Sequence, residues 1–418
     1  MANDNEIVAT KPKKKESVAA NRLRDIVTES YQKALDAKAR GELVGWSTSK
    51  FPAELWATFD LNIVYPENQA AAIGAQHDSE RLCLVAEDMG YDADICAYAR
   101  INIALTSGVE TKASKRIPMP DFLLCCTSSC NCFTKWYETI ARMRNIPIVY
   151  IDIPYHNTIG VDEGHIKYVR AQFDEAIKQL EEISGKKWDP KKFEEMCAIS
   201  NRTSKAWHKA CAYTQHKPSP LSGFDLLNHM ANMMLGRCNL EVAEAFELLV
   251  NEYDENLANN ESTLPFPEQY RIMLEGIPCW PHLKTLFKPM KENGLNVTTV
   301  VYAPAFGFEY NNIDEMIQAY SKTPGAVCIE EGVEWREDEC RTNKVDGILV
   351  CYNRSCKAWC GYMPEMERRW EESLGVPVAS FDGDQADPRC FTAASYEVRA
   401  QGFVEAMAAN KKKKEAQV

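Results

Sequence analysis

The sequence predicts an α/β fold with two Rossmann-like parallel-sheet domains, related as a divergent internal repeat and joined by a helical insertion. Two matched segments carry this prediction, Asp121-Phe-Leu-Leu-Cys-Cys-Thr-Ser-Ser-Cys130 and Asp346-Gly-Ile-Leu-Val-Cys-Tyr-Asn-Arg-Ser-Cys356. Each has an acidic residue, an apolar run and a pair of cysteines separated by four residues, Cys125 and Cys130 in the first and Cys351 and Cys356 in the second. Each precedes an amphipathic stretch and a second strand-like run. Because the carboxyl ends of parallel strands border the ligand crevice of such a sheet, thiols placed there suggest a metal centre shared between the domains.

The first half of the chain alternates between helical and strand-like patterns, as expected of parallel β/α units. A helix is expected over 17–40, where apolar residues recur on one face, and Gly41 should end it. The other expected helices are 52–58, 79–89 and 132–144, and the expected strands are 43–49, 61–65, 122–126 and 148–153.

The middle of the chain reads as helical. Apolar residues recur at helical spacing from Ile166 to about Leu257, and Pro190 sits near the start of one of these helices, where proline is favoured. The β/α pattern then returns, with strand-like runs over 270–280, 297–302, 347–351 and 376–381. Gly45-Trp46 and Cys279-Trp280 each precede a helix and a strand, so we expect them to be equivalent positions of the repeat.

These patterns divide the chain into five segments. The ends carry runs of lysine, which are typical of solvated, disordered tails. The expected segments are a disordered basic tail (1–16), an N-terminal helix with the first α/β domain (17–165), a helical segment (166–268), the second α/β domain (269–408) and a basic tail (409–418).

Composition excludes several classes of protein. The formal net charge of −12 argues against binding to nucleic acid, which needs a basic surface. No apolar run is long enough for a membrane span and no signal peptide opens the chain, so we expect a cytoplasmic protein. In that compartment the 16 cysteines would stay reduced, so they are more typical of buried apolar residues, metal ligands or reactive thiols than of disulfides.

Short cofactor motifs are missing from the sequence. It has no G-x-x-x-x-G-K-[ST] phosphate loop, no G-x-G-x-x-G after a strand and no H-E-x-x-H. Hydrolysis of ATP through a phosphate loop and binding of a dinucleotide in the usual manner are therefore disfavoured.

Three cysteines stand out by position. Cys130 and Cys356 lie just past strands of the two halves, and Cys96 follows a predicted helix. Soft thiolates without accompanying histidines favour an iron–sulfur cluster or structural zinc. Spacing alone leaves two questions open: whether all three are simply buried, and whether a neighbouring cysteine is the true ligand. These neighbours are Cys125, Cys126, Cys132, Cys351 and Cys360.

Longer strings carry a resemblance to a known family. They are Val44-Gly-Trp-Ser-Thr-Ser49, Tyr65-Pro-Glu-Asn-Gln-Ala-Ala71, Cys96-Ala-Tyr-Ala-Arg100, Pro120-Asp-Phe-Leu-Leu-Cys-Cys126, Asn353-Arg-Ser-Cys-Lys357 and Phe381-Asp-Gly-Asp-Gln-Ala-Asp-Pro-Arg389. Together they closely resemble the α subunits of the clostridial (R)-2-hydroxyacyl-CoA dehydratases, which act on lactoyl-, phenyllactoyl- and 2-hydroxyisocaproyl-CoA. Benzoyl-CoA reductase subunits are more distant relatives. The resemblance covers residues 20 to about 408.

The resemblance implies an oxygen-sensitive hydro-lyase of anaerobic amino-acid fermentation. It implies a heterodimer with a β subunit, a [4Fe-4S] cluster in each subunit, and a separate ATP-hydrolysing iron–sulfur activator that injects one electron. FMN is kept open as a further cofactor of the heterodimer.

The resemblance also assigns residues. The cluster ligands fall on Cys96, Cys130 and Cys356, and the serine and glutamate near the open fourth iron fall on Ser49 and Glu67. Without the resemblance, Ser49 reads equally well as a helix cap and Glu67 as a solvated turn residue. One departure is visible, because relatives have Asn-Asn-Ile where this chain has Thr127-Ser-Ser129; the change could alter hydrogen bonding to the cluster.

The implied reaction removes water through a ketyl radical of the thioester, formed at the cluster with an electron that is recycled. Glu67 and an iron-bound hydroxide are alternative bases. Two other functions stay open, a reductase subunit of the benzoyl-CoA type and a non-catalytic subunit with structural zinc. The acyl group is not determined by the sequence.

Overall fold

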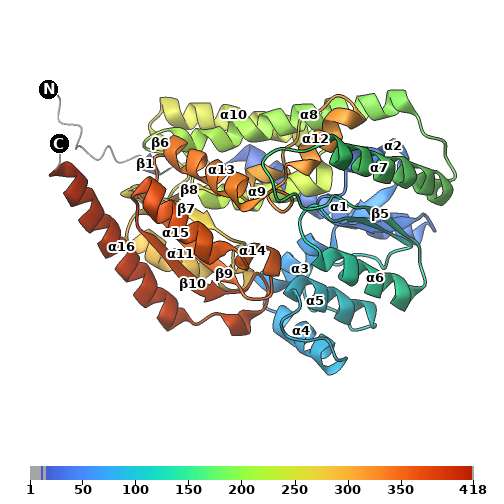
Figure 1. The fold of residues 1–418 in the computed structure, drawn as a ribbon, viewed down its shortest axis with the longest axis horizontal. Coiled ribbons are helices and arrows are strands. Elements are labelled where there is room, and N and C mark those ends of the chain that lie inside the picture. The colour runs from blue at the N-terminus through green and yellow to red at the C-terminus, as the bar shows by residue number, and fades with distance from the viewer. Residues whose placement is uncertain (1–10, 13–15, 417–418) are drawn as a thin grey trace.

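The computed structural model describes residues 11–12 and 16–416, and within them two four-stranded sheets have all their strands parallel (Figure 1). The first sheet has the order β3-β2-β4-β5 and the second the order β8-β7-β9-β10. The strands are β2 (Val44–Ser47), β3 (Asn62–Val64), β4 (Phe122–Cys126), β5 (Ile148–Ile151), β7 (Tyr270–Glu275), β8 (Leu295–Thr299), β9 (Gly347–Asn353) and β10 (Val378–Gly383). Each sheet thus places its strands in the same spatial order, which confirms the predicted pair of parallel-sheet α/β domains.

The two matched acidic residues have the same role in the two sheets. Asp121 Oδ2 accepts a hydrogen bond from the Val44 amide at 2.9 Å, just before β4 pairs with β2. Asp346 Oδ2 accepts one from the Arg271 amide at 2.8 Å, just before β9 pairs with β7. This repeated contact at the start of the central strand pair supports the internal repeat.

Six helices accompany the first sheet. They are α1 (Val18–Ala39), α2 (Ala53–Thr58), α3 (Pro66–Ala75), α4 (Ser79–Asp88), α5 (Ala97–Thr106) and α6 (Cys132–Arg144). The sequence analysis did not anticipate α3 and α5. Cys96 follows a helix, α4, as predicted, and it is also the N-cap residue of α5.

The middle of the chain is helical, as predicted, and forms four long helices. They are α7 (Glu163–Ser184), α8 (Pro190–Ala212), α9 (Gly223–Gly236) and α10 (Leu240–Ala258), with the 3₁₀ turn η1 (Tyr213–Gln215) after α8. Figure 1 shows α8 and α10 side by side along one edge of the molecule. The short strand β6 (Glu261–Ser262) follows α10 and pairs in parallel with β1 (Lys11–Pro12).

The helices of the last third are α11 (Leu283–Glu292), α12 (Ile313–Ser321), α13 (Ile329–Thr342), α14 (Lys357–Cys360), α15 (Met363–Leu374) and α16 (Ala393–Glu415), with 3₁₀ turns η2 (Trp280–His282), η3 (Pro304–Phe306) and η4 (Pro388–Cys390). Most of them pack around the second sheet, but α12 packs against α7 in the core of the first sheet. The expected equivalence of Trp46 and Trp280 is wrong, because Trp46 lies within β2 whereas Trp280 lies in η2, beyond the end of β7.

Residues 409–415, expected to form a basic tail, are the last turns of α16. The expected N-terminal tail falls mostly on residues 1–10 and 13–15, which lie outside the described residues, as do 417–418.

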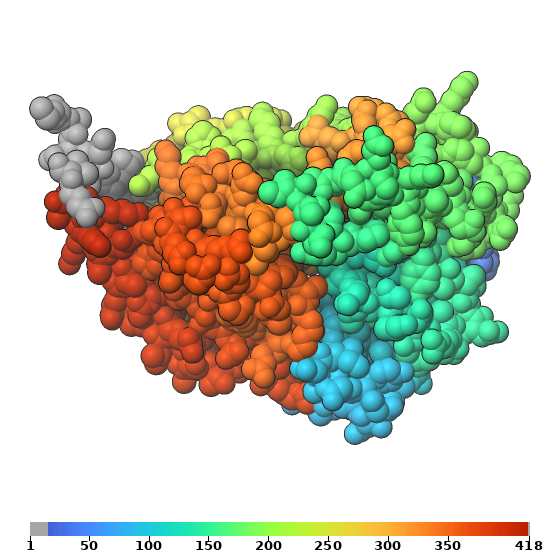
Figure 2. Space-filling model, viewed as in Figure 1, coloured from blue at the N-terminus to red at the C-terminus, as the bar shows by residue number. Residues whose placement is uncertain are grey.

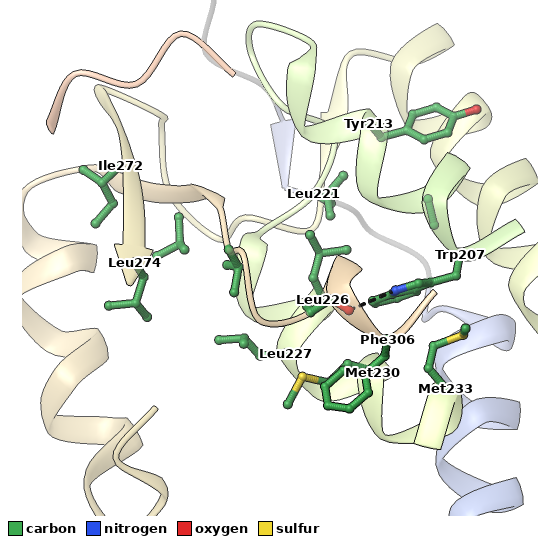
Figure 3. Close-up of a cluster of buried hydrophobic side chains, with 14 of the residues drawn as sticks. Trp207, Tyr213, Leu221, Leu226, Leu227, Met230, Met233, Ile272, Leu274 and Phe306 are labelled. Carbon is green, nitrogen blue, oxygen red and sulfur yellow. Dashed lines mark hydrogen bonds between the residues drawn. The ribbon is translucent and has the colours of Figure 1, made fainter. Parts of the chain in front are cut away.

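One hydrophobic core joins the helical segment to the second sheet. Figure 3 shows Trp207 of α8 facing Phe306 of η3 and Met230 of α9, and the Trp207 indole N–H donates to the Ala303 carbonyl at 3.2 Å. The core around the first sheet includes Ala386, which follows β10. The two halves of the chain therefore share packing, and Figure 2 shows their surfaces in direct contact.

Within the described ranges, no helix combines the length and the apolar character that a bilayer crossing requires.

Candidate active site

All of the predicted site residues line one cavity of about 90 Å³, at the carboxyl ends of the strands of both sheets. The residues are Ser49, Glu67, Cys96, Cys130 and Cys356. Ser49 follows β2, Cys130 follows β4 and Cys356 follows β9, whereas Glu67 lies in the first turn of α3. The two halves of the chain therefore meet at the place where the sequence predicted a shared centre.

Each of the three thiols lies at the start of a helix. Cys96 and Cys356 are the N-cap residues of α5 and α14, and Cys130 directly precedes the N-cap of α6. In every case the backbone amide three residues further on lowers the pKa of the thiol; these amides belong to Ala99, Phe133 and Trp359. Backbone N–H groups at a helix start favour the anionic thiolate.

Burial acts in the opposite direction. It raises the pKa of Cys130 and of Cys356 well above the ordinary value, and the neighbouring thiols raise both further. The pKa of Cys96 is raised chiefly by the Cys132 thiol and then by burial. Thiols gathered in this way ionise only when a cation compensates their charge, as happens when a metal centre binds.

The arrangement of these donors fits a cluster better than a single ion. A structural zinc ion needs four ligands that converge on one point, whereas the thiolates of an iron–sulfur cluster bind different iron atoms. In the part of the chain that the structure describes, no three His, Cys, Asp or Glu side chains converge on a point that could hold one metal ion. The three half-buried thiols line one cavity and could serve as the protein ligands of a cluster.

The structure narrows the choice of ligands. Of the neighbouring cysteines that spacing left open, only Cys132 also lines the cavity. Cys125 and Cys126 are buried within β4. Cys351 is buried within β9, where its Sγ lies 3.5 Å from that of Cys279. Cys360, at the end of α14, is not among the residues that line the cavity.

Of the three residues 127–129, which depart from the family pattern, two do not line the cavity. Thr127 Oγ1 donates to Asp152 Oδ1 at 2.8 Å, and the Ser128 hydroxyl accepts from the Cys126 thiol at 3.5 Å. Only Ser129 lines the cavity.

Ser49 holds the carboxylate of Glu67. The Ser49 amide donates to Glu67 Oε1 at 2.6 Å, and its hydroxyl donates to Oε2 at 3.0 Å. Burial raises the pKa of Glu67 to about 7, although the Ser49 hydrogen bonds and the Lys50 charge oppose the shift. The alternative interpretations, Ser49 as a helix cap and Glu67 as a solvated turn residue, are wrong, because the N-cap of α2 is Pro52 and Glu67 is buried.

A chain of hydrogen bonds fixes Cys96 beside the second domain. Asp384 Oδ2 accepts from the Ser355 amide at 2.8 Å and from its hydroxyl at 2.6 Å. Ser355 Oγ accepts in turn from the Ala97 amide at 2.9 Å. Gln385 Nε2 donates to Cys96 Sγ at 3.4 Å. Gln385 Oε1 is buried and has no hydrogen-bond partner among the described residues.

Ion pairs reinforce the same junction. Arg100 of α5 is fully buried and lies 2.5 Å from Glu87 and 3.0 Å from Asp387. Arg389 also contacts Glu87, at 3.1 Å, and Asp387, at 2.6 Å. The string from Phe381 to Arg389, quoted above for its resemblance, therefore joins α4 and α5 to the second sheet.

Sequence reasoning missed several residues of the cavity wall, of which Lys50 carries the strongest chemistry. The side chain of Lys50 is buried, and its Nζ donates to the Ala305 carbonyl and lies 4.3 Å from the ring centroid of Phe306. Burial, with the Arg237 charge next in size, lowers the pKa of Lys50 to about 7. Lys50 directly follows Ser49, a predicted site residue, and this position could have identified Lys50 from the sequence. Tyr98, Tyr302 and Gln385 line the cavity as well.

A larger cavity of about 520 Å³ adjoins the first. Glu67, Tyr98 and Tyr302 line both cavities, and the larger one also has the cationic side chains of Arg24 and Lys115 in its wall.

Several known proteins are similar in sequence to this chain over almost its whole length. The α subunit of (R)-2-hydroxyglutaryl-CoA dehydratase from Acidaminococcus fermentans is 50% identical, over 94% of this chain and 97% of its own length. The α subunit of (R)-phenyllactyl-CoA dehydratase from Clostridium sporogenes is 48% identical, over 95% and 97%. The α subunit of (R)-2-hydroxyisocaproyl-CoA dehydratase from Clostridioides difficile is 46% identical, over 93% and 96%.

The family model described as 2-hydroxyglutaryl-CoA dehydratase, D-component, matches residues 48–407. That span includes every residue of the predicted site and all the strands of the two sheets except β2. The chain belongs to the 2-hydroxyglutaryl-CoA dehydratase D-component family.

Proposed function

We propose that this chain is the α subunit of an (R)-2-hydroxyacyl-CoA dehydratase, a hydro-lyase that removes water from a 2-hydroxyacyl thioester. The observation that carries the proposal is the meeting of Ser49, Glu67 and three cysteines from both halves of the chain at one cavity. The names of the relatives, all of them α subunits of dehydratases for such thioesters, support the same reaction.

Cys96, Cys130 and Cys356 would hold a [4Fe-4S] cluster in this cavity. When bound, the cluster would supply an open iron as Lewis acid and one-electron chemistry, so that water leaves through a ketyl radical and the electron is recycled. The Gln385 amide that donates to Cys96 would tune the electron density at that thiolate. FMN in the assembled enzyme stays a prediction.

Side chains of this protein would accept and release the proton that the reaction removes. Glu67 faces the cavity, and its pKa of about 7 lets it accept and release a proton near neutral pH. The two hydrogen bonds from Ser49 fix the direction of the carboxylate. Aromatic side chains would keep bulk water from the reacting thioester; those in the wall are Tyr98, Phe133, Trp136, Tyr302, Phe306 and Trp359.

The adjoining larger cavity would take the coenzyme A arm. It opens onto the site through the shared residues Glu67, Tyr98 and Tyr302. Arg24 and Lys115 supply positive charge in its wall, which suits the phosphates of coenzyme A.

The first prediction concerns partners. Since the sequence has no phosphate loop, we expect the chain alone to be inactive with ATP and a reductant, and activity to need a β subunit and an ATP-dependent iron–sulfur activator. The measurement is the ratio of enoyl-CoA formed to reductant consumed in the reconstituted system, with the chain alone as control. A dehydratase should form many products per electron. A ratio near one would instead indicate a reductase, and activity of the isolated chain would contradict the need for partners.

The second prediction concerns ligation. Replacing Cys96, Cys130 or Cys356 by alanine should remove most of the iron that this chain binds and abolish dehydration, because a cluster loses one of its few anchors. Cys360→Ala is the matched control, since Cys360 lies close to Cys356 in sequence but not in the cavity wall. Iron per chain and the visible absorption of anaerobic protein are the measurements. The Cys132→Ser variant should keep its iron. If Cys132→Ser lost iron and Cys96→Ser kept it, Cys132 and not Cys96 would be the ligand.

The third prediction concerns Glu67. Glu67→Gln should leave the iron content unchanged and lower turnover by roughly 10²–10⁴-fold, the usual effect of losing an acid–base group. Because the base must be deprotonated, the wild-type rate should rise with pH through about 7, and this rise should disappear in the variant. Glu372→Gln, at an exposed position of α15, is the control. Wild-type turnover in Glu67→Gln with an intact cluster would exclude the catalytic role.

A further inference from the structure

Lys50 contributes an amine to the wall of the smaller cavity, and the roles proposed above do not use it. Its side chain is 5% exposed, and its Nζ lies over the rings of Phe306 and Phe308, 4.3 and 4.6 Å from their centroids. The same Nζ donates to the Ala305 carbonyl, which is its one hydrogen-bond acceptor among the described residues. Because an ammonium group has three N–H donors, a ligand in the cavity could accept a further hydrogen bond from Lys50.

Lys50 lies beside the group that is proposed as the base. It directly follows Ser49, whose amide and hydroxyl donate to the two oxygens of Glu67 at 2.6 and 3.0 Å. Glu67 and Lys50 also shift each other's pKa through their charges, as expected of neighbouring side chains in one cavity. Elimination of water from two adjacent carbon atoms is helped by a base at one carbon and an acid at the other. Glu67 and Lys50 could supply both.

The surroundings of Lys50 make it able to release a proton. Burial and then the charge of Arg237 lower its pKa to about 7, while the charges of Cys126 and Glu67 oppose the shift. An acid with a pKa near the working pH is protonated often enough to act and still gives up its proton readily. The amine of Lys50 therefore suits proton transfer near neutral pH.

The phenols of the same wall are less suited to this task. Tyr98 and Tyr302 both line the cavity, and burial raises the pKa of each well above its ordinary value. Neither phenol would release its proton readily near neutral pH. The thiols that are proposed as cluster ligands would carry no proton once the cluster is bound.

We propose that Lys50 is the catalytic acid that protonates the α-hydroxyl group as it leaves the thioester. The carbon–oxygen bond breaks, its electron pair stays on the oxygen, and a proton of the ammonium group completes a molecule of water. Glu67 takes the β-proton, and transfer of that proton to the neutral amine restores both side chains. The net step moves one proton from carbon to the leaving oxygen and consumes no oxidant or reductant. The inference rests on the proposed dehydratase function and assigns one further residue of its site.

A leaving group that needs no proton tests the proposal. Chloride leaves as a stable anion, so its elimination from a 2-chloroacyl thioester should need Glu67 but not Lys50, whereas elimination of water should need both. The reconstituted heterodimer with its activator is assayed with 2-hydroxyglutaryl-, phenyllactyl- and 2-hydroxyisocaproyl-CoA, the thioesters in the names of the relatives. The best of the three is then compared with the 2-chloro thioester of the same chain.

The variants should divide by leaving group. Lys50→Met should lower dehydration by roughly 10²–10⁴-fold and leave chloride elimination close to the wild-type rate. Lys50→Arg should behave like Lys50→Met, because a guanidinium group keeps the charge but does not release a proton. Glu67→Gln should lower both rates, and Lys135→Met, at an exposed position of α6, should lower neither. Retained chloride elimination would also show that the Lys50 variants fold and keep a working site.

The pH dependence of the wild type gives a second readout. Lys50 must be protonated to act and Glu67 must be deprotonated. With the 2-hydroxy thioester, the rise in rate that Glu67 causes should therefore be followed by a fall at higher pH. With the 2-chloro thioester the rise should remain and the fall should be absent.

The outcomes separate this inference from the function on which it rests. Equal losses of dehydration and chloride elimination in Lys50→Met would mean that Lys50 maintains the cavity as a whole. Wild-type dehydration in Lys50→Met or Lys50→Arg would mean that the proton comes from elsewhere. Either result would overturn the role of Lys50 and leave the dehydratase function standing. If the wild type dehydrates none of the three thioesters, the dehydratase function is wrong and the role of Lys50 is wrong with it.

Discussion

The site depends on one hydrogen-bond chain, from Asp384 through Ser355 to the backbone of Ala97. It holds the start of α5, and with it Cys96, against the loop that carries Cys356. The residues that form these hydrogen bonds are buried. In such surroundings a hydrogen bond is strong and an unpaired polar group is costly, so these bonds favour a single arrangement of the two halves. The ion pair of Arg100 with Asp387 reinforces the same junction. Without this junction, the thiols would belong to two separate sheets.

A second constraint is desolvation of charge around the cavity. Burial raises the pKa of Glu67 and of the thiols and lowers that of Lys50, so it favours the neutral form of each group. Groups perturbed in this way gather where a protein binds charged ligands or moves protons. A metal centre would compensate the charge of the thiolates.

Much of the fold could be predicted because its strands and helices follow from local patterns of apolar and polar residues. The acidic residue, apolar run and paired cysteines of each half correspond to β4 and β9, and Asp121 and Asp346 make the same contact. The helix α3 was missed because Pro66-Glu67 reads as a turn, although proline also favours the first turn of a helix. The site depended on the resemblance, since contacts such as Ser49 with Glu67 and Ala97 with Ser355 join residues that are distant in sequence. Lys50 escaped notice because its burial comes from packing against η3, which no local pattern shows.

The most direct test of the account is a crystal structure of the anaerobically reconstituted heterodimer, with diffraction recorded on both sides of the iron absorption edge. The account predicts one compact group of anomalous iron peaks in this chain, bounded by the sulfur atoms of Cys96, Cys130 and Cys356, with Glu67 facing it. A single peak at the zinc edge, or iron held by a different set of cysteines, would contradict it.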